Sequence, residues 1–286
     1  MSFGGHHTRK RFGQHWLTDA AVLERIVAAA ELQPGERVLE VGPGRGALTE
    51  RLLATALGEL HAIELDRDLV AGLRQHFAGD ERFQLLEGDV LRLNLPPADK
   101  VVANIPYNIT GPLLERLVGR LDRPLASPYR RLVLLVQQEV GERIRAVAGS
   151  SAFSALSVRL QLLAHCRSVC AVPPRCFQPS PKVMSEVIVI DPLPPSERLE
   201  PELAGRLEGL LKRCFAARRK MLRNSLAGLW PEDELSERAE RAGVSLRQRP
   251  QELSPQRWVE LTRQLCPRPQ FPRESSSPIP EKTAHG

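Results

Sequence analysis

The residues whose types and order could do chemistry begin with the tetrapeptide Asn104-Ile105-Pro106-Tyr107. Asn104 offers a side-chain carbonyl that accepts a hydrogen bond. Pro106 biases Ile105 toward an extended backbone, which aims the Ile105 carbonyl in a fixed direction. Tyr107 presents a flat ring of the kind on which nucleobases stack. Two acceptors beside one ring suit the exocyclic amino group of a planar base. A strand end followed by a proline turn, with Tyr107 in the core, would have the same sequence.

A short strand must position this tetrapeptide. The apolar run 100–103 precedes it and is predicted to form a buried strand. In open α/β sheets, ligands bind beside the carboxyl ends of the strands. Asn104 is therefore predicted to lie at the ligand-binding edge of such a sheet.

A glycine-rich turn upstream predicts the first unit of a nucleotide-binding α/β fold. The predicted strand 37–41 runs into Gly42-Pro43-Gly44-Arg45-Gly46, and residues 47–57 continue as a helix. Glycines let the backbone turn sharply and approach a ligand without a Cβ clash. The spacing is G-x-G-x-G, which differs from the G-x-G-x-x-G of dinucleotide-binding proteins. Glycine turns after strands are common, so this turn gains its meaning from the strands that follow.

Acidic residues lie at the ends of the next two predicted strands. Strand 60–64 ends in Glu64, 18 residues past Gly46, where a carboxylate accepts hydrogen bonds from ribose hydroxyls. The alternative role of Glu64 is to cap the predicted helix 66–77. Strand 83–86 is followed by Asp89, which is placed to accept from an adenine amino group, while the N–H of Val90 serves the ring. For Asp89 the alternative is an ordinary turn residue.

The remaining elements are predicted from apolar periodicity and capping residues. Thr18 or Asp19 is predicted to cap a helix that ends near Glu31, and Thr110 to cap the helix 113–120. Further strands are predicted at 132–136 and 187–190, and a further helix at 137–148. A proline-fixed loop, 173–183, carries one aromatic side chain, Phe177, which is predicted to stack on the second face of the base.

The C-terminal part is helical and basic. After a proline-rich linker at 191–196, helical periodicity covers 203–230, 233–242 and 255–265. Six bases without an intervening acid lie in the first of these segments: Lys212, Arg213, Arg218, Arg219, Lys220 and Arg223. We expect a phosphate-contacting surface there, the alternative being a solvated helix face.

The whole composition bounds the class of protein. The chain has 286 residues, a net charge of +6 and a pI of about 9.4, which favour an anionic partner such as nucleic acid. No run of 18 apolar residues and no apolar N-terminal core occur, so neither a transmembrane helix nor a secretory signal is expected. Five cysteines without a C-x-x-C pair predict free thiols in a reducing compartment and no metal site. We expect a cytoplasmic monomer.

Several motifs taken as an ordered set resemble the KsgA (RsmA) family of ribosomal RNA adenine dimethyltransferases, over residues from about 9 to 265. The segments that carry the resemblance are Arg11-Phe12-Gly13-Gln14, Glu40-Val41-Gly42-Pro43-Gly44, Ile63-Glu64-Leu65-Asp66-Arg67-Asp68, Asn104-Ile105-Pro106-Tyr107-Asn108-Ile109, Phe177-Gln178-Pro179-Ser180-Pro181-Lys182-Val183 and Arg218-Arg219-Lys220 with Arg223-Asn224-Ser225-Leu226.

The resemblance implies a fold, a cofactor and a substrate. It implies a class I methyltransferase (Rossmann-like) sheet, parallel with one reversed strand near its end, and a small helical C-terminal domain. The implied cofactor is S-adenosyl-L-methionine. The implied substrate is a pair of adjacent adenines in a hairpin loop near the 3′ end of 16S rRNA in the 30S subunit. The expected division is a flexible 1–8, a methyltransferase domain 9–192, an RNA-binding domain 197–266 and a disordered 267–286.

The resemblance also implies roles for individual residues. Glycines near Gly42 contact the methionine part of the cofactor, Glu64 the ribose and Asp89 the adenine, and Asn104 is shared between the cofactor and target sites. An N-terminal arm closes over the cofactor with Gln14, His15 and Leu17. The chain departs from the family where His15 replaces the usual Asn, Trp16 the usual Phe and Gln138 a frequent Lys.

Two other functions share these features. A DNA adenine methyltransferase uses a similar Asn-x-Pro-Tyr pocket on a flipped base, although the basic C-terminal part is small for reading duplex sequence. A non-catalytic RNA-binding or ribosome assembly factor would keep the fold. The intact set of acceptors and ring, Asn104 to Tyr107, argues against a loss of catalysis.

Overall fold

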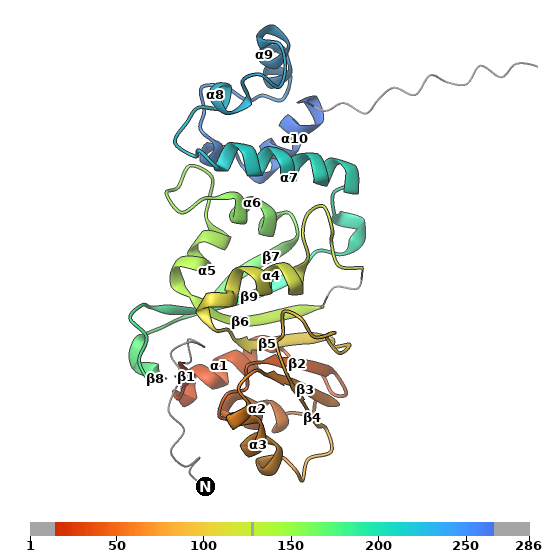
Figure 1. Cartoon of the computed structure of the whole chain (residues 1–286), viewed down its shortest axis with the longest axis vertical. Helices are drawn as coiled ribbons and strands as arrows, with labels where there is room; N and C mark the ends of the chain where they lie inside the picture. Colours follow the sequence, from red (N-terminus) through yellow and green to blue (C-terminus); the bar gives the residue numbers. More distant parts are fainter. Residues whose placement is uncertain (1–14, 127–128, 266–286) are drawn as a thin grey trace, which may run out of the picture.

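The structure is a computed structural model that describes residues 15–126 and 129–265. A seven-stranded sheet forms the centre of the protein (Figure 1). The strand order is β4–β3–β2–β5–β6–β9–β7. The bounds of these strands are β2 (Arg37–Val41), β3 (Glu59–Glu64), β4 (Phe83–Glu87), β5 (Lys100–Asn104), β6 (Arg131–Gln137), β7 (Ala164–Val172) and β9 (Ser185–Pro192).

One strand of this sheet runs against the others. Strands β4, β3, β2, β5 and β6 pair in parallel, whereas β9 is antiparallel to both β6 and β7. The Rossmann-like α/β class and the single reversed strand near the end of the sheet are therefore confirmed. Because β9 is reversed, its first residue, Ser185, lies beside Gln137 at the carboxyl ends of the parallel strands.

Helices cover both faces of the sheet, because alternate strand residues point to opposite sides. The helices are α1 (Ala20–Ala30), α2 (Ala47–Leu53), α3 (Arg67–His76), α4 (Thr110–Val118), α5 (Gln138–Arg145), α6 (Ala155–Gln161), α7 (Pro201–Phe215), α8 (Leu222–Leu226), α9 (Glu232–Arg241) and α10 (Pro255–Leu265). Leu60, Val133 and Val189 join a core with α1, α2 and α3. Leu134 and Ile190 join a second core with α4, α5 and α6.

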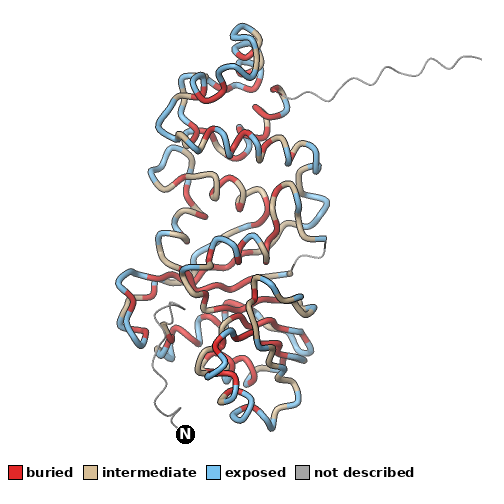
Figure 2. Tube along the Cα trace, in the orientation of Figure 1, coloured by how far each residue is buried: buried red, intermediate tan, exposed pale blue. Residues whose placement is uncertain are grey.

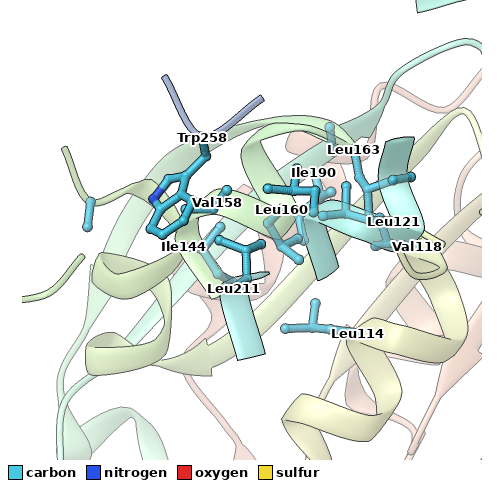
Figure 3. Packing of buried hydrophobic residues seen from close by; sticks show 14 of the residues in the cluster. Leu114, Val118, Leu121, Ile144, Val158, Leu160, Leu163, Ile190, Leu211 and Trp258 are labelled. Carbon is cyan, nitrogen blue, oxygen red and sulfur yellow. The ribbon is translucent and has the colours of Figure 1, made fainter. Parts of the chain in front are cut away.

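The second core extends without interruption into the C-terminal helices. Trp258 of α10 and Leu211 of α7 are fully buried, and they belong to one cluster with Val158 of α6 and Ile190 of β9 (Figure 3). Figure 2 shows the buried positions along the trace from the sheet to these helices. The division into domains at about residues 192–197, which stays a prediction, therefore does not coincide with a break in the hydrophobic core.

Four local predictions differ from the structure. Strand β7 was not predicted, because its sequence alternates poorly and much of it is exposed at the sheet edge. The predicted helix 203–230 is two helices, α7 and α8. Helices α2 and α5 stop at Leu53 and Arg145, short of the predicted ends. Thr110 does not cap a helix; it lies inside the first turn of α4, where its hydroxyl donates to the Tyr107 carbonyl at 3.2 Å.

The segments 1–8 and 267–286, together with Gln14 and Cys266, lie outside the described residues. In the described part, Asp19 caps α1 by accepting a hydrogen bond from the Val22 N–H at 3.1 Å. Of the two predicted capping residues, Thr18 and Asp19, the cap is therefore Asp19. No helix within 15–126 and 129–265 is both long and apolar enough to traverse a lipid bilayer.

Candidate active site

Asn104 lies at the carboxyl end of β5, in the middle of the sheet. Its side-chain nitrogen donates to the backbone carbonyl of His15 at 3.1 Å. This bond fixes the amide orientation, so the Asn104 carbonyl oxygen is the atom left to accept a hydrogen bond from a ligand. The residue thus ties the N-terminal arm to the strand end and still presents an acceptor.

The next two residues make the chain turn beside a cavity. The Ile105 N–H bonds to the Leu135 carbonyl at 3.2 Å, and the Ile105 side chain is buried. Pro106 has φ −57° and ψ 126°, after which Tyr107–Ile109 form a 3₁₀ turn. A cavity of about 100 Å³ opens here, lined by His15, Trp16, Gly42, Gly44, Glu64, Leu65, Leu69, Asn104, Ile105, Pro106, Tyr107, Asn108 and Ile109.

The Tyr107 side chain has one contact at its hydroxyl and another on the face of its ring. Its hydroxyl bonds to the Ser185 hydroxyl at 2.5 Å, and burial raises the pKa of the phenol, so the group is neutral at physiological pH. The His15 ring stacks on the Tyr107 ring, with centroids 5.7 Å apart and planes 26° apart. Because a carbonyl can only accept, the contact of 2.8 Å to the Pro179 carbonyl makes His15 Nδ1 a donor.

Glu64 ends β3 at the same edge of the sheet. One carboxylate oxygen accepts from the Gly44 N–H at 3.1 Å and the other from the Asp66 N–H at 2.8 Å. Burial raises the pKa of Glu64, and these backbone donors partly offset the shift. The carboxylate is therefore oriented by the chain and retains acceptor capacity toward the cavity, while the N-cap of α3 is Asp66 and not Glu64.

The glycine turn has a backbone conformation and a close packing that side chains would disturb. Gly42, Gly44 and Gly46 have φ of 71°, 59° and 85°, values that L side chains rarely adopt. A Cβ on Gly44 would lie 3.0 Å from the Trp16 ring, so the arm and the turn pack closely.

The N-terminal arm closes over this turn through a short sheet. Strand β1 (Trp16–Leu17) pairs antiparallel with β8 (Phe177–Gln178), and Leu17 lies opposite Phe177. A second cavity, about 270 Å³, lies between the arm and the turn. It shares Trp16, Gly42, Gly44 and Asn104 with the first cavity, and Leu17 lines it.

Three predicted site residues lie elsewhere in the described structure. The Phe177 ring is buried in the core on the α1 side and lines neither cavity. Asp89 accepts from the Leu91 N–H at 2.9 Å, which is the geometry of a turn residue, and Val90 is buried in the core on the α4 side. Their roles toward a base and a cofactor remain predictions.

Other residues at the site were not predicted from the sequence. Ser185 reaches Tyr107 only because β9 is reversed, which no local pattern around Ser185 signals. Leu65 is 49% exposed beside the cavity, an uncommon position for a leucine that follows a buried strand. Glu40 is fully buried beneath the glycine turn, accepts from the Thr49 hydroxyl at 2.7 Å, and has a pKa raised to about 8 by desolvation.

The basic cluster, defined as Lys212, Arg213, Arg218, Arg219, Lys220 and Arg223, lies at the end of α7 and in the segment that leads into α8. All six are exposed, and none forms an ion pair with an acid in the described part of the chain. Arg218 donates to the Ser151 carbonyl at 2.7 Å, in the loop between α5 and α6. Within residues 15–126 and 129–265, no group of three or more His, Cys, Asp or Glu could hold a metal ion.

Comparisons with known proteins agree on one family. The model of the ribosomal RNA adenine dimethylase family matches residues 5–265. Proteins named ribosomal RNA small subunit methyltransferase A from Prochlorococcus marinus (strain MIT 9303) and Parasynechococcus marenigrum (strain WH8102) are each 67% identical over 270 residues, which is 93% of this chain and 96% and 89% of theirs.

Two solved structures share the fold over most of the chain. A dimethyladenosine transferase from Plasmodium falciparum superposes with a TM-score of 0.77 at 25% identity, covering 86% of this chain and 96% of its own. The 23S rRNA methyltransferase ErmE superposes with a TM-score of 0.71 at 27% identity, covering 87% and 99%.

Proposed function

The chain belongs to the ribosomal RNA adenine dimethylase family, and from that premise we propose that it transfers methyl groups from S-adenosyl-L-methionine to the N6 amino groups of two adjacent adenines in 16S rRNA. The observation that carries the proposal is the meeting of Asn104, Tyr107 and Glu64 around one cavity. These residues come from two separate stretches of sequence, the end of β3 and the tetrapeptide after β5, and each is of the type that the reaction needs.

The residues around the two cavities fit this cofactor. Glu64 is oriented to accept from ribose hydroxyls, and the glycines Gly42 and Gly44, both at positive φ, border the two cavities without side chains. When bound, S-adenosylmethionine supplies an electrophilic methyl carbon on sulfur. Glu64 would hold the ribose, and Gly42, Gly44 and the arm residues His15 and Leu17 would enclose the amino-acid part.

Asn104 and Ile105 would prepare the amine of the target base. The lone pair of an adenine amino group is delocalised into the ring, so the amine is a poor nucleophile. The Asn104 carbonyl oxygen and the Ile105 backbone carbonyl would accept hydrogen bonds from its two N–H groups and favour a pyramidal nitrogen. Because positioning supplies most of the rate in such a reaction, no acid–base pair is assigned.

Tyr107 would hold the base by stacking. Ser185 and the turn at Pro106 fix the ring plane, and His15 now covers part of the ring. A base that stacks on that face must displace the His15 ring or extend the stack. Stacking places the amine without sequence-specific contacts.

The basic cluster would contact RNA phosphates. Its six exposed charges and the net charge of +6 fit a polyanionic partner. We assign residues 9–192 to the cofactor and the target base, residues 197–266 to RNA, and the 30S subunit as the natural partner. A cytoplasmic monomer is the form we propose.

One experiment separates this function from its competitors. Transfer of labelled methyl groups from S-adenosylmethionine should modify adenines of undermethylated 30S subunits and leave duplex DNA unmodified. Modification of duplex DNA would indicate a DNA methyltransferase. Binding to subunits without transfer would indicate an assembly factor that has lost the chemistry.

A further inference from the structure

The cavity between the arm and the glycine turn contains one charged side chain. It is lined by Trp16, Leu17, Thr18, Leu23, Gly42, Pro43, Gly44, Arg45, Ala47, Leu48 and Asn104. Arg45 is the one ionisable residue among these described lining residues. The cavity therefore presents a positive charge among backbone and apolar groups, which favours an anionic ligand group.

Arg45 is held in a defined position by the arm. Its guanidinium carbon lies 3.7 Å from the centroid of the Trp16 ring, and Trp16 is only 9% exposed. A guanidinium that stacks on an aromatic face still directs N–H donors outward in its own plane. The stack thus orders a long, flexible side chain at the cavity wall.

Each cavity has a lining residue of opposite charge that the other lacks. Glu64 lines the first cavity and Arg45 the second, while Trp16, Gly42, Gly44 and Asn104 line both. S-adenosylmethionine has matching ends, because its ribose offers hydroxyl donors and its amino-acid part carries a carboxylate. A ligand whose ribose lies at Glu64 and whose amino acid crosses the glycine turn reaches the side where Arg45 lies.

We propose that Arg45 binds the carboxylate of the amino-acid part of the cofactor and is a specificity-determining residue for it. This proposal rests on the proposed function. It assigns a role to a position inside the glycine turn whose side chain the nucleotide-binding pattern leaves unspecified. It also gives Trp16 a role, since the indole ring holds the guanidinium in place.

The test compares two ligands that differ only by the carboxylate. Titration calorimetry measures binding of S-adenosylhomocysteine and of 5′-(3-aminopropylthio)-5′-deoxyadenosine to the wild type and to Arg45→Met, which keeps a linear side chain against Trp16. We expect Arg45→Met to weaken S-adenosylhomocysteine about ten- to hundredfold, the range for a lost hydrogen bond to a charged group. The decarboxylated ligand should bind both proteins within about twofold.

Two further variants complete the design. Arg45→Lys keeps the charge but loses the planar guanidinium, so its affinity for S-adenosylhomocysteine should lie between those of the wild type and Arg45→Met. Arg25→Met removes an exposed charge of α1 that lines neither cavity and should change neither affinity.

The outcomes distinguish this proposal from the function on which it rests. If Arg45→Met weakens the binding of both ligands equally, or weakens the binding of neither, the carboxylate assignment is overturned. Unchanged ligand affinities with weakened RNA binding would instead make Arg45 a phosphate contact. If the wild type binds neither ligand, the proposed function itself fails.

Discussion

Asn104 has two tasks, one for each polar atom of its side-chain amide. Its nitrogen holds the arm through the His15 carbonyl, and its oxygen is the proposed acceptor for the target amine. An acceptor that matters mainly in the transition state affects turnover more than binding.

We therefore expect Asn104→Ala to bind cofactor and RNA measurably and to lose turnover about 10²–10³-fold, the range for a preorganised transition-state hydrogen bond. The measurement is single-turnover methylation of undermethylated 30S subunits at saturating cofactor. Asn94→Ala, an exposed asparagine remote from both cavities, is the control. Near-normal turnover of Asn104→Ala would reject the acceptor model.

Tyr107 allows the ring and the hydroxyl to be tested apart. Tyr107→Ala removes a stacking face, so target binding should weaken by about 1–3 kcal/mol. Tyr107→Phe keeps the face and loses only the bond to Ser185, about 0.5–1.5 kcal/mol, so turnover should change little. Ser185→Ala removes the same bond from the other side and should match Tyr107→Phe. If Tyr107→Phe is as damaged as Tyr107→Ala, the hydroxyl takes part in the reaction.

Glu64 should make cofactor affinity depend on pH. Ribose hydroxyls bind the ionised carboxylate, whose pKa burial raises above its usual value of 4.5. Affinity should therefore be complete above the raised pKa and be lost as pH falls through it. Glu64→Gln should weaken binding and remove this dependence in titration calorimetry. Glu87→Gln, the neighbouring strand-end acid, should keep the wild-type profile. Identical profiles for Glu64→Gln and the wild type would remove Glu64 from the site.

At the scale of elements, the strand ends could be predicted from the residue pattern, whereas the arm was expected only from the family resemblance. Each of β2, β3 and β5 is a largely buried strand that ends in or directly precedes a distinctive residue, so the meeting of Gly42, Glu64 and Asn104 follows from a parallel sheet. The pairing of β1 with β8 joins segments about 160 residues apart, and two-residue strands have no periodicity. The stacking of His15 on Tyr107 and of Trp16 on Arg45 depends on that pairing.

The stacking role of Phe177 stays a prediction. A lone aromatic residue in a proline-rich loop resembles a stacking platform, and in this structure the ring is buried in the same core cluster as Leu17, the residue that pairs with it. Conversely, Ser185 was missed because its role depends on the direction of a strand, and direction is a property of the whole sheet.

Glu40, in the strand β2 that leads into the glycine turn, should make the stability of the protein depend on pH. Its pKa is about 8 in the folded protein and near 4.5 when exposed, so the folded state binds the extra proton between these values. The free energy of unfolding should then fall as pH rises from about 4.5 to 8 and stay constant above pH 8. The loss is at most about 1.36 kcal/mol for each pH unit of this range.

Glu40→Gln keeps an acceptor for the Thr49 hydroxyl and cannot ionise. Its stability relative to the wild type should therefore be clearly greater at pH 9 than at pH 5, by a few kcal/mol. Urea unfolding at both pH values measures the difference. The same shift in Glu50→Gln, an exposed acid of α2, would mean that Glu40 is not its source.

At the scale of the whole molecule, the basic cluster should determine the salt dependence of RNA binding. Replacing Arg218, Arg219, Lys220 and Arg223 by Gln should lower the slope of log K against log salt by roughly 0.7–0.9 for each lost phosphate contact. Cofactor affinity should not change.

A control with the same loss of charge replaces Arg25, Arg67, Arg74 and Arg92, which are exposed on the sheet domain. Filter binding of 30S subunits at several salt concentrations measures both sets. If the two sets lower the slope equally, only net charge matters and the cluster is a solvated face.

The reversal of β9 has a consequence for the kind of RNA that we expect the protein to accept. The strand leaves the proposed catalytic edge at Ser185, and α7 brings the chain back toward that side, where Arg218 bonds to the loop after α5 (Figure 1). The C-terminal helices share one hydrophobic core with the sheet around Trp258 and Leu211. The proposed phosphate contacts and the proposed adenine pocket therefore belong to one packed body. We expect the protein to favour an RNA whose fold presents a phosphate and an unstacked adenine together over an RNA that offers the base sequence alone.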